Sequence, residues 1–315
     1  MASENTGKKK KKKHNPVTDW LLYLLLRILV VFLSLFDIQT NLNTACLLGR
    51  LLWKYYHRGR ERAMENLRAS FPQATEQWLR QTGRRSFEHL AMFVMDTLFA
   101  PRLITKKNLR NFCTFKNTER AKWLMKEGSG LILVTAHYSN FEITGYLLGL
   151  FGFNIYSIAR PLDNKYISRY IYGVRKRSGL SIIDKKGATE SMEQIVSGGA
   201  TLGFIADQDA GKKGVFVDFF GRKASTYKSI GLLAMAYNLP IVVGYSRRID
   251  NKFFFEIGTN RIIMPQEWAD MAQPLEWITA QYSGAIEQFI RDEPSQYWWL
   301  HRRWKHRPKN EKQPA

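Results

Sequence analysis

Residues 131–150 read LILVTAHYSNFEITGYLLGL. An apolar run at 131–136 leads directly into His137, and a second apolar stretch follows Glu142. The first run has the length of a buried β-strand, whereas the second is long enough for a helix. We therefore predict a strand, a turn and a helix, with His137 at the end of the strand and Glu142 in the first helical turn.

The rest of the chain repeats this alternation of short apolar runs and helical segments. Strands are expected near 131–136, 154–160, 180–184, 201–206, 214–220, 239–246 and 253–258. Strands interleaved with helices predict an α/β sheet. Residues 42–100 have apolar side chains at helical spacing, with a break at Pro72, so a helical lead-in precedes the sheet.

The composition indicates an anionic partner. The 315 residues include 48 Lys and Arg against 27 Asp and Glu, a formal net charge of +21. Membranes, nucleic acids and acidic carrier proteins all fit such a charge. No zinc finger, helix-turn-helix or RNP-like signature is present, which disfavours nucleic acid and favours anionic lipid. Cys46 and Cys113 lack CxxC spacing, which indicates neither a zinc site nor a disulfide framework and fits a reducing compartment.

The first residues predict a membrane anchor. Residues 1–16 form a basic polar tail that contains Lys8 to Lys13, and we expect it to be disordered. The apolar run 20–36 is interrupted only by Arg27 and would extend roughly 26 Å as a helix, just short of a hydrocarbon core of about 30 Å. A signal peptide is the competing interpretation, but the run is long and no small-residue cleavage site follows it. A spanning helix and a helix lying in the interface both stay open.

The predicted position of His137 suggests acid–base chemistry. Active sites of α/β sheets gather at the carboxyl ends of strands. A turn there would let the Glu142 carboxylate bond one ring nitrogen of His137 and leave the other facing substrate, as in a general base with an orienting acid. Two alternatives remain: Ser139 and Glu142 have the spacing of a capping box, and His137 could be a satisfied core histidine. A metal site is disfavoured, because there is no HExxH motif and no second cluster.

Two further segments place polar residues at strand ends. Arg160 follows the expected strand 154–160 and could hold a phosphate or carboxylate, or could form a surface salt bridge. Asp207 follows the strand 201–206, with glycines after it that would let the backbone approach a ligand; a plain acidic turn is the alternative.

Four motifs occur in the order AHYSNFE, ARPLDN, IADQDAGKKGVFVDFFG and PSQYWWLHRRWKHRP. Together with the N-terminal apolar run they resemble the late acyltransferases of lipid A biosynthesis, the lauroyl and myristoyl transferases of Gram-negative bacteria. The resemblance extends to Pro308. It implies a mixed central sheet flanked by helices, similar to glycerol-3-phosphate acyltransferases, in a catalytic domain at 38–308. An anchoring helix at 17–37 would precede this domain, and a frayed tail at 309–315 would follow it.

The resemblance also implies an activity and a location. The family transfers an acyl chain from an acyl carrier protein thioester to a hydroxyl of a glycolipid precursor of lipid A, at the cytoplasmic face of the bacterial inner membrane, without a cofactor. His137 would be the general base and Glu142 its orienting group. Arg160 would contact the acceptor phosphate or the oxyanion, and Asp207 would be a second polar contact near His137. Acylation of another glycolipid or phospholipid and a non-catalytic lipid-binding role are the alternatives.

The closing motif combines cations with aromatic side chains. We expect this group to hold the acyl carrier protein or lipid headgroups at the interface, with an interfacial structural helix as the alternative. Its members are Arg302, Arg303, Lys305, Arg307, Trp298, Trp299 and Trp304.

Overall fold

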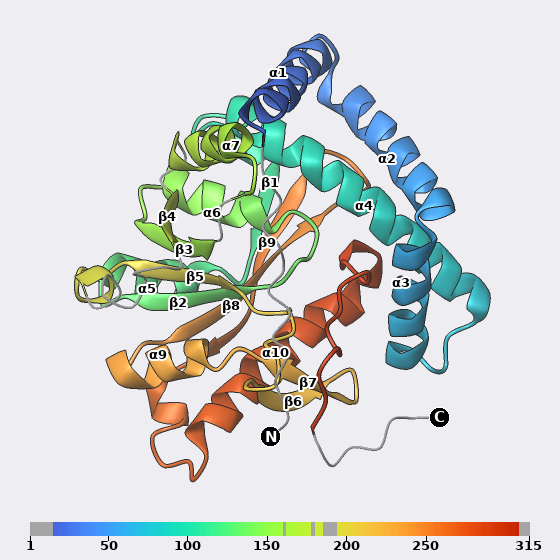
Figure 1. Ribbon diagram of the computed structural model, residues 1–315. Helices are drawn as coiled ribbons and strands as arrows, with labels where there is room; N and C mark the ends of the chain where they lie inside the picture. Colours follow the sequence, from blue (N-terminus) through green and yellow to red (C-terminus); the bar gives the residue numbers. More distant parts are fainter. Residues whose placement is uncertain (1–14, 160–161, 178–179, 185–193, 309–315) are drawn as a thin grey trace, which may run out of the picture.

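The computed structural model of the protein describes residues 15–159, 162–177, 180–184 and 194–308 (Figure 1). Its centre is a sheet in the order β1-β9-β8-β2-β5-β3-β4. Neighbouring strands are parallel except β8 and β9, which are antiparallel. The strands are β1 (Cys113–Lys116), β2 (Leu131–Thr135), β3 (Ile155–Ala159), β4 (Leu180–Asp184), β5 (Thr201–Ile205), β8 (Ile241–Arg248) and β9 (Phe255–Ile263). The fold is therefore α/β with a mostly parallel mixed sheet flanked by helices.

Helices precede the sheet and cover its faces. They are α1 (Pro16–Leu33), α2 (Ile38–Tyr55), α3 (His57–Ser70), α4 (Glu76–Leu103), α5 (Glu119–Glu127), α6 (Phe141–Leu150), α7 (Lys165–Arg177), α9 (Ser229–Tyr237) and α10 (Pro274–Asp292). Short 3-10 turns occur at Leu109–Asn111, Pro265–Glu267 and Pro294–Gln296. The predicted helical lead-in corresponds to α2, α3 and α4.

The expected strands all form, but one of them lies outside the sheet. The segment predicted near 214–220 is β6 (Val215–Phe219), which pairs with β7 (Arg222–Thr226) in a separate antiparallel hairpin. The sequence prediction missed β7 and β1. Their charged or polar side chains conceal the apolar alternation of a strand.

The central strand β2 is buried on both sides, which explains its continuous apolar sequence. Leu131 and Leu133 belong to a cluster with α5. Ile132 and Val134 belong to the larger core that includes α9 and α10. The strand is thus held rigidly, and so is the residue that leaves its carboxyl end.

The N-terminal helix α1 is apolar and mostly exposed. Its length and composition are those of a helix that could cross a membrane, and 17% of it is buried. The helix ends at Leu33, earlier than the predicted boundary at residue 37. The Ser34 hydroxyl donates to Val30 O (2.6 Å), and Asp37 already caps α2 by accepting from Thr40 N (3.0 Å).

Candidate active site

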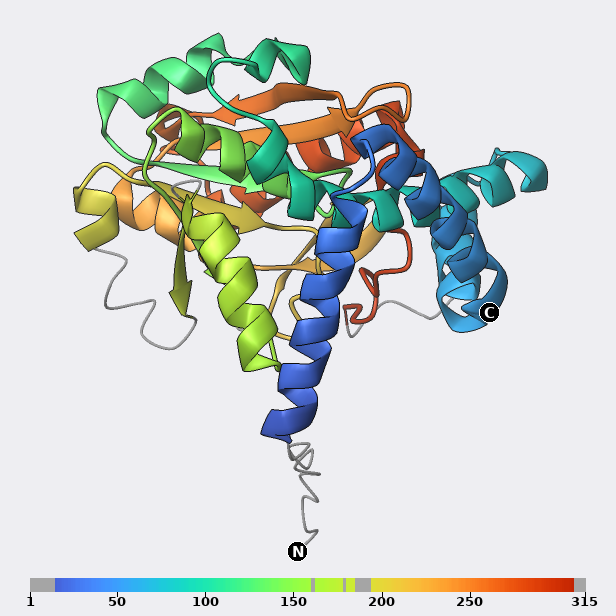
Figure 2. The same cartoon turned by 90° about the horizontal axis from the view of Figure 1, so that it is seen from above.

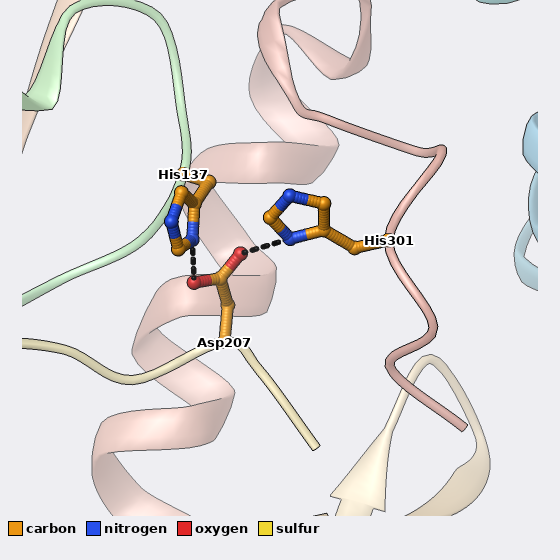
Figure 3. A group of neighbouring side chains, drawn as sticks. All are labelled: His137, Asp207 and His301. Atoms are coloured by element: carbon orange, nitrogen blue, oxygen red, sulfur yellow. Dashed lines mark hydrogen bonds and ion pairs between the residues drawn. The ribbon is translucent and has the colours of Figure 1, made fainter. Parts of the chain in front are cut away.

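The register of β2 and β5 brings His137 and Asp207 together. Thr135 lies opposite Ile205 in this parallel pair, and Ala206 N donates to Thr135 O (2.9 Å) just beyond it. His137 and Asp207 each follow their strand's last paired residue by two positions. Their side chains therefore meet at the carboxyl edge of the sheet, with 2.8 Å between His137 Nδ1 and Asp207 Oδ1 (Figure 3).

This contact corrects the role that we expected for Glu142. The Glu142 carboxylate is paired with Arg175 of α7, whose Nε lies 3.0 Å from Oε2 and whose Nη2 contacts Oε1. Asp207, which we expected to be a second polar contact, is instead the carboxylate on the His137 ring. Glu142 lies after the turn, in the first turn of α6, so its side chain points to the neighbouring α7 rather than back to the end of β2.

The capping box, the alternative interpretation of Ser139 and Glu142, does not form either. Asn140 caps α6, its side-chain oxygen accepting from Ile143 N (3.1 Å). Ser139 lies one residue earlier in the left-handed region (φ 45°), and its hydroxyl accepts from Arg248 N (3.1 Å). The turn after His137 is therefore fastened to β8 as well as to its own helix.

Asp207 is a fully buried carboxylate whose charge is stabilised by its neighbours. Burial alone would raise the pKa of Asp207, but the charge of the His137 ring and the hydrogen bond from it hold this pKa well below the usual range. An ionised carboxylate accepts hydrogen bonds only, so Nδ1 of His137 carries the proton. The Nε2 lone pair, which lies 3.4 Å from the Gln208 side-chain amide nitrogen, is then the acceptor for a proton from a substrate that displaces this amide.

A second histidine completes the group, and the sequence reasoning missed it. His301 Nδ1 lies 4.0 Å from Asp207 Oδ2, and the ring centroids of His301 and His137 are 4.5 Å apart (Figure 3). Burial, and then the neighbouring charge of His137, lowers the pKa of His301 to about 4, so this ring is neutral at neutral pH. The sequence shows a histidine inside the closing motif, but the position of His301 in the chain gives no indication that it lies near Asp207.

Aromatic rings form a wall around His137. Phe141 and Trp298 each have a ring centroid 5.1 Å from the imidazole, and Phe93 of α4 stacks on Phe141 at 4.8 Å. This apolar wall keeps one side of the imidazole away from water, which strengthens its bond to Asp207.

The C-terminal segment is hydrogen-bonded to the turn that carries His137. Trp298 N donates to His137 O (3.2 Å), Ser139 N donates to Gln296 O (2.8 Å), and Tyr138 and Tyr297 form an antiparallel bridge. The closing motif is therefore built into the site.

This placement corrects our interpretation of the basic and aromatic C-terminal group. Trp299 is fully buried against Phe71 and Phe220. Arg303 is buried as well, and donates to Ser225 O (2.6 Å) and other acceptors on the β5–β7 segment. Neither side chain is available to a lipid headgroup or a carrier protein, whereas Arg302 and Lys305 are exposed. Arg160, the other expected cation, lies outside the described residues.

An apolar cavity lies beside the site. Its volume is about 310 Å³, and it lies between α5, α6 and strands β2, β8 and β9. A smaller hollow of about 60 Å³ is lined by Thr135, Phe141 and Glu142, the residues that flank the His137 turn. The two share Leu133 and Thr144 as walls. The two hollows are therefore neighbours, with these side chains between them.

His137, Asp207 and His301 also offer the ligand types of a transition-metal site. One ligand atom from each lies within 4.8 Å of the others. The 2.8 Å separation of Nδ1 and Oδ1 is that of an N–H···O hydrogen bond, and a metal on Nδ1 would have to replace its proton. The observed geometry therefore fits a hydrogen bond that holds the His137 ring in one tautomer better than it fits a bound metal.

Comparison with known proteins identifies the family of the chain. Residues 7–306 match the family model of bacterial lipid A biosynthesis acyltransferases. The lipid A biosynthesis lauroyltransferase of Escherichia coli (strain K12) is 27% identical over 294 residues, 92% of this chain and 92% of that protein. The lipid A biosynthesis palmitoleoyltransferase of the same strain is 24% identical over 296 residues, 93% of each chain.

A third relative matches over a shorter part of the chain than these two. It is a lipid A biosynthesis acyltransferase of Haemophilus influenzae, 24% identical over 242 residues, 76% of this chain and 74% of that protein. The family match covers nearly the whole sequence and confirms the resemblance drawn from the four motifs. The chain belongs to the bacterial lipid A biosynthesis acyltransferase family.

Proposed function

We propose that the protein transfers a fatty acyl group from an acyl carrier protein thioester to a hydroxyl of a lipid A precursor, a secondary acylation at the cytoplasmic face of the bacterial inner membrane. The observation that carries this proposal is the 2.8 Å contact between His137 and the buried Asp207, beside an apolar cavity. Such a pair is a general base with its orienting acid, and the cavity suits a hydrocarbon chain.

The reaction follows from the tautomer of His137. Nε2 removes the proton from the acceptor hydroxyl, and the oxygen forms a bond to the thioester carbonyl carbon. The C–S bond breaks when the tetrahedral intermediate collapses, and the leaving thiolate takes the proton from Nε2. Asp207 stabilises the imidazolium between these steps. The products are an ester and a free thiol, and no acyl-enzyme is required.

The two other expected site residues take supporting roles. Glu142 lines the smaller hollow and pairs with Arg175, so that the two charges balance each other there. Arg160 keeps the role suggested by its motif, a cation for the acceptor phosphate or the oxyanion.

The large cavity would receive the acyl chain. Its walls include Ala121, Met125, Leu148 and Val242, and each buried methylene contributes about 0.8 kcal/mol to binding. The names of the two Escherichia coli relatives differ in the acyl group, which is consistent with a chain-binding cavity that varies within the family.

Several features support the location and the partners. The apolar α1 and the basic residues on either side of it suit attachment to an anionic membrane. The net charge of +21 suits an acidic carrier protein. The strand, the histidine turn and the helix with Glu142 support a glycerol-3-phosphate acyltransferase-like fold for the catalytic domain.

The test is mass spectrometry of the glycolipid fraction from a bacterial host that lacks its own late acyltransferases. Lipid A from cells producing the wild-type chain should gain the mass of one fatty acid minus one water. Cells producing His137→Ala at equal membrane abundance should show no gain. If the folded wild-type protein adds nothing to lipid A, this acceptor is wrong, and the total lipid extract would then reveal whether another glycolipid is acylated.

A further inference from the structure

α1 and α7 lie side by side and project from the same side of the molecule, as the blue and yellow-green helices of Figure 2 show. The contact between them is specific. Tyr23 stacks on Tyr166 with 6.2 Å between ring centroids. The Arg27 guanidinium lies 5.1 Å from the centroid of Tyr170 and donates to the Tyr23 hydroxyl (2.9 Å). These side chains join the two helices along one seam.

The outer end of the seam is closed by a backbone contact. The Asn164 amide, at the start of α7, donates to Asp19 O in the first turn of α1 (2.8 Å). The same asparagine accepts from Tyr166 N (2.9 Å) and so caps α7. The beginning of α7 is therefore held against α1.

The inner end of α7 reaches the active site. Arg175 lies one and a half turns after Tyr170 and forms the ion pair with Glu142, whose side chain lines the hollow beside His137. The base of α1 is fixed to the same region, because Val30 and Leu33 share a buried cluster with Ile143 of α6. A continuous set of contacts thus leads from α1 through α7 to the smaller hollow beside His137.

Arg27 is the residue that a simple anchor would not need. A cation within an otherwise apolar membrane helix is costly, and such residues usually have a partner and a function. On the outer side of α1, Leu21 and Leu25 are 52% and 63% exposed and make no comparable contact in the described part of the chain. The helix therefore has an apolar side suited to lipid and a Tyr–Arg side suited to α7.

We infer that α1 is a positioning element of the active site, and that Tyr23 and Arg27 act through α7 to hold Arg175 against Glu142. This inference rests on the proposed acyl transfer for its activity readout. An apolar helix of the same length without Tyr23 and Arg27 would not perform this function.

The test compares variants that all keep α1 apolar. The docking variant carries Tyr23→Leu and Arg27→Leu, and the matched control carries Leu21→Ala and Leu25→Ala on the exposed side. A conservative variant, Tyr23→Phe with Arg27→Lys, keeps the ring contact and the cation. We expect the docking variant to stay in the membrane fraction and to lose about two- to fivefold in kcat, the scale of a cation–π contact at an exposed site. The control and the conservative variant should stay near wild type.

A double-mutant cycle separates positioning from general stability. Arg175→Gln alone should also lower kcat, and adding it to the docking variant should cause little further loss, because both changes break the same chain of contacts. Losses that multiply in the combined protein, or a docking variant with wild-type kcat, would overturn the inference.

Hydrogen exchange of the α7 backbone amides tests the inference without any activity. Protection of α7 should fall in the docking variant and stay unchanged in the control. Equal protection in both proteins contradicts the inference whatever the acceptor proves to be. Absence of transfer by the wild-type protein would count against the proposed function and leave this measurement valid.

Discussion

Thr135 and Ile205 face each other as the last paired residues of β2 and β5, and this register sets the meeting of His137 with Asp207. A slip of one residue would move Asp207 by about 3.3 Å and turn its side chain to the opposite face of the sheet. The catalytic geometry that we propose is thus a property of the sheet rather than of a flexible loop.

Asp207→Asn should lower kcat by about a hundredfold or more, because an amide can donate to Nδ1 and favour the wrong imidazole tautomer. The protein should keep its fold and its place in the membrane. Steady-state transfer with an acyl carrier protein donor provides the measurement.

Two isosteric changes serve as controls for that variant. Glu142→Gln should cost less than Asp207→Asn, because Glu142 contacts Arg175 and not His137. Asp209→Asn should cost less again, since Asp209 bonds His306 (2.7 Å). A larger loss from Glu142→Gln than from Asp207→Asn would contradict our assignment of the orienting acid.

The sequence predicted that His137 and Asp207 stand at strand ends, but not that they touch. Consecutive strands are usually neighbours, which would place β3 beside β2. In the structure β5 lies between them, and this order brings Asp207 to the His137 ring. Glu142 is close to His137 in sequence and was therefore the obvious partner for it. Glu142 instead pairs with Arg175, which lies 33 residues away on α7.

The C-terminal motif shows a different limit of sequence reasoning. Arg303 and Trp299 have the composition of an interfacial surface, and both are buried. The acceptors that allow Arg303 to be buried include the carbonyls of Gln208 and Ser225. Every residue carries a carbonyl, so no sequence pattern marks these acceptors. The helical lead-in and the strand positions were predictable because they depend on local periodicity alone.

The acyl chain length should respond to the volume of the large cavity. Ala121→Phe fills space beneath α5 and should shift the transferred chain to shorter acyl groups, whereas Leu148→Ala should admit longer ones. One methylene changes discrimination by about 1–3 kcal/mol, enough to change the main product. Mass spectrometry of lipid A from cells with each variant measures the shift. The same chain length in both variants would show that the cavity does not hold the chain.

Acid should destabilise the protein through His89. Burial, and then the charges of Arg248 and Arg85, lowers the pKa of His89 to about 3. Below a pH of about 6.5 the unfolded state binds a proton that the folded state does not, so the free energy of unfolding falls as the pH drops towards the folded pKa. His89→Gln should remove about 3 kcal/mol of the difference between pH 7.5 and 4.5, measured by urea unfolding in detergent. An unchanged difference would contradict the prediction.

The ion pair between Asp96 and Arg248 should be sensitive to the loss of one partner. Both side chains are buried, and Arg248 also donates to Lys252 O (2.6 Å). Asp96→Ala leaves a buried guanidinium unpaired and should cost about 3–5 kcal/mol of stability. The double variant Asp96→Leu with Arg248→Met should be more stable than Asp96→Ala alone. Thermal unfolding in detergent tests this order, and the reverse order would contradict it.

The pairing of the His137 turn with Gln296 and Trp298 has a consequence for biosynthesis. Protein synthesis delivers α1 well before the residues around Trp298, at about 5–20 residues per second. The turn at His137 is therefore synthesised while it still lacks the segment that pairs with it. The protein acquires its complete site only after the residues around Trp298 have been synthesised, so the order of synthesis itself delays the start of chemistry.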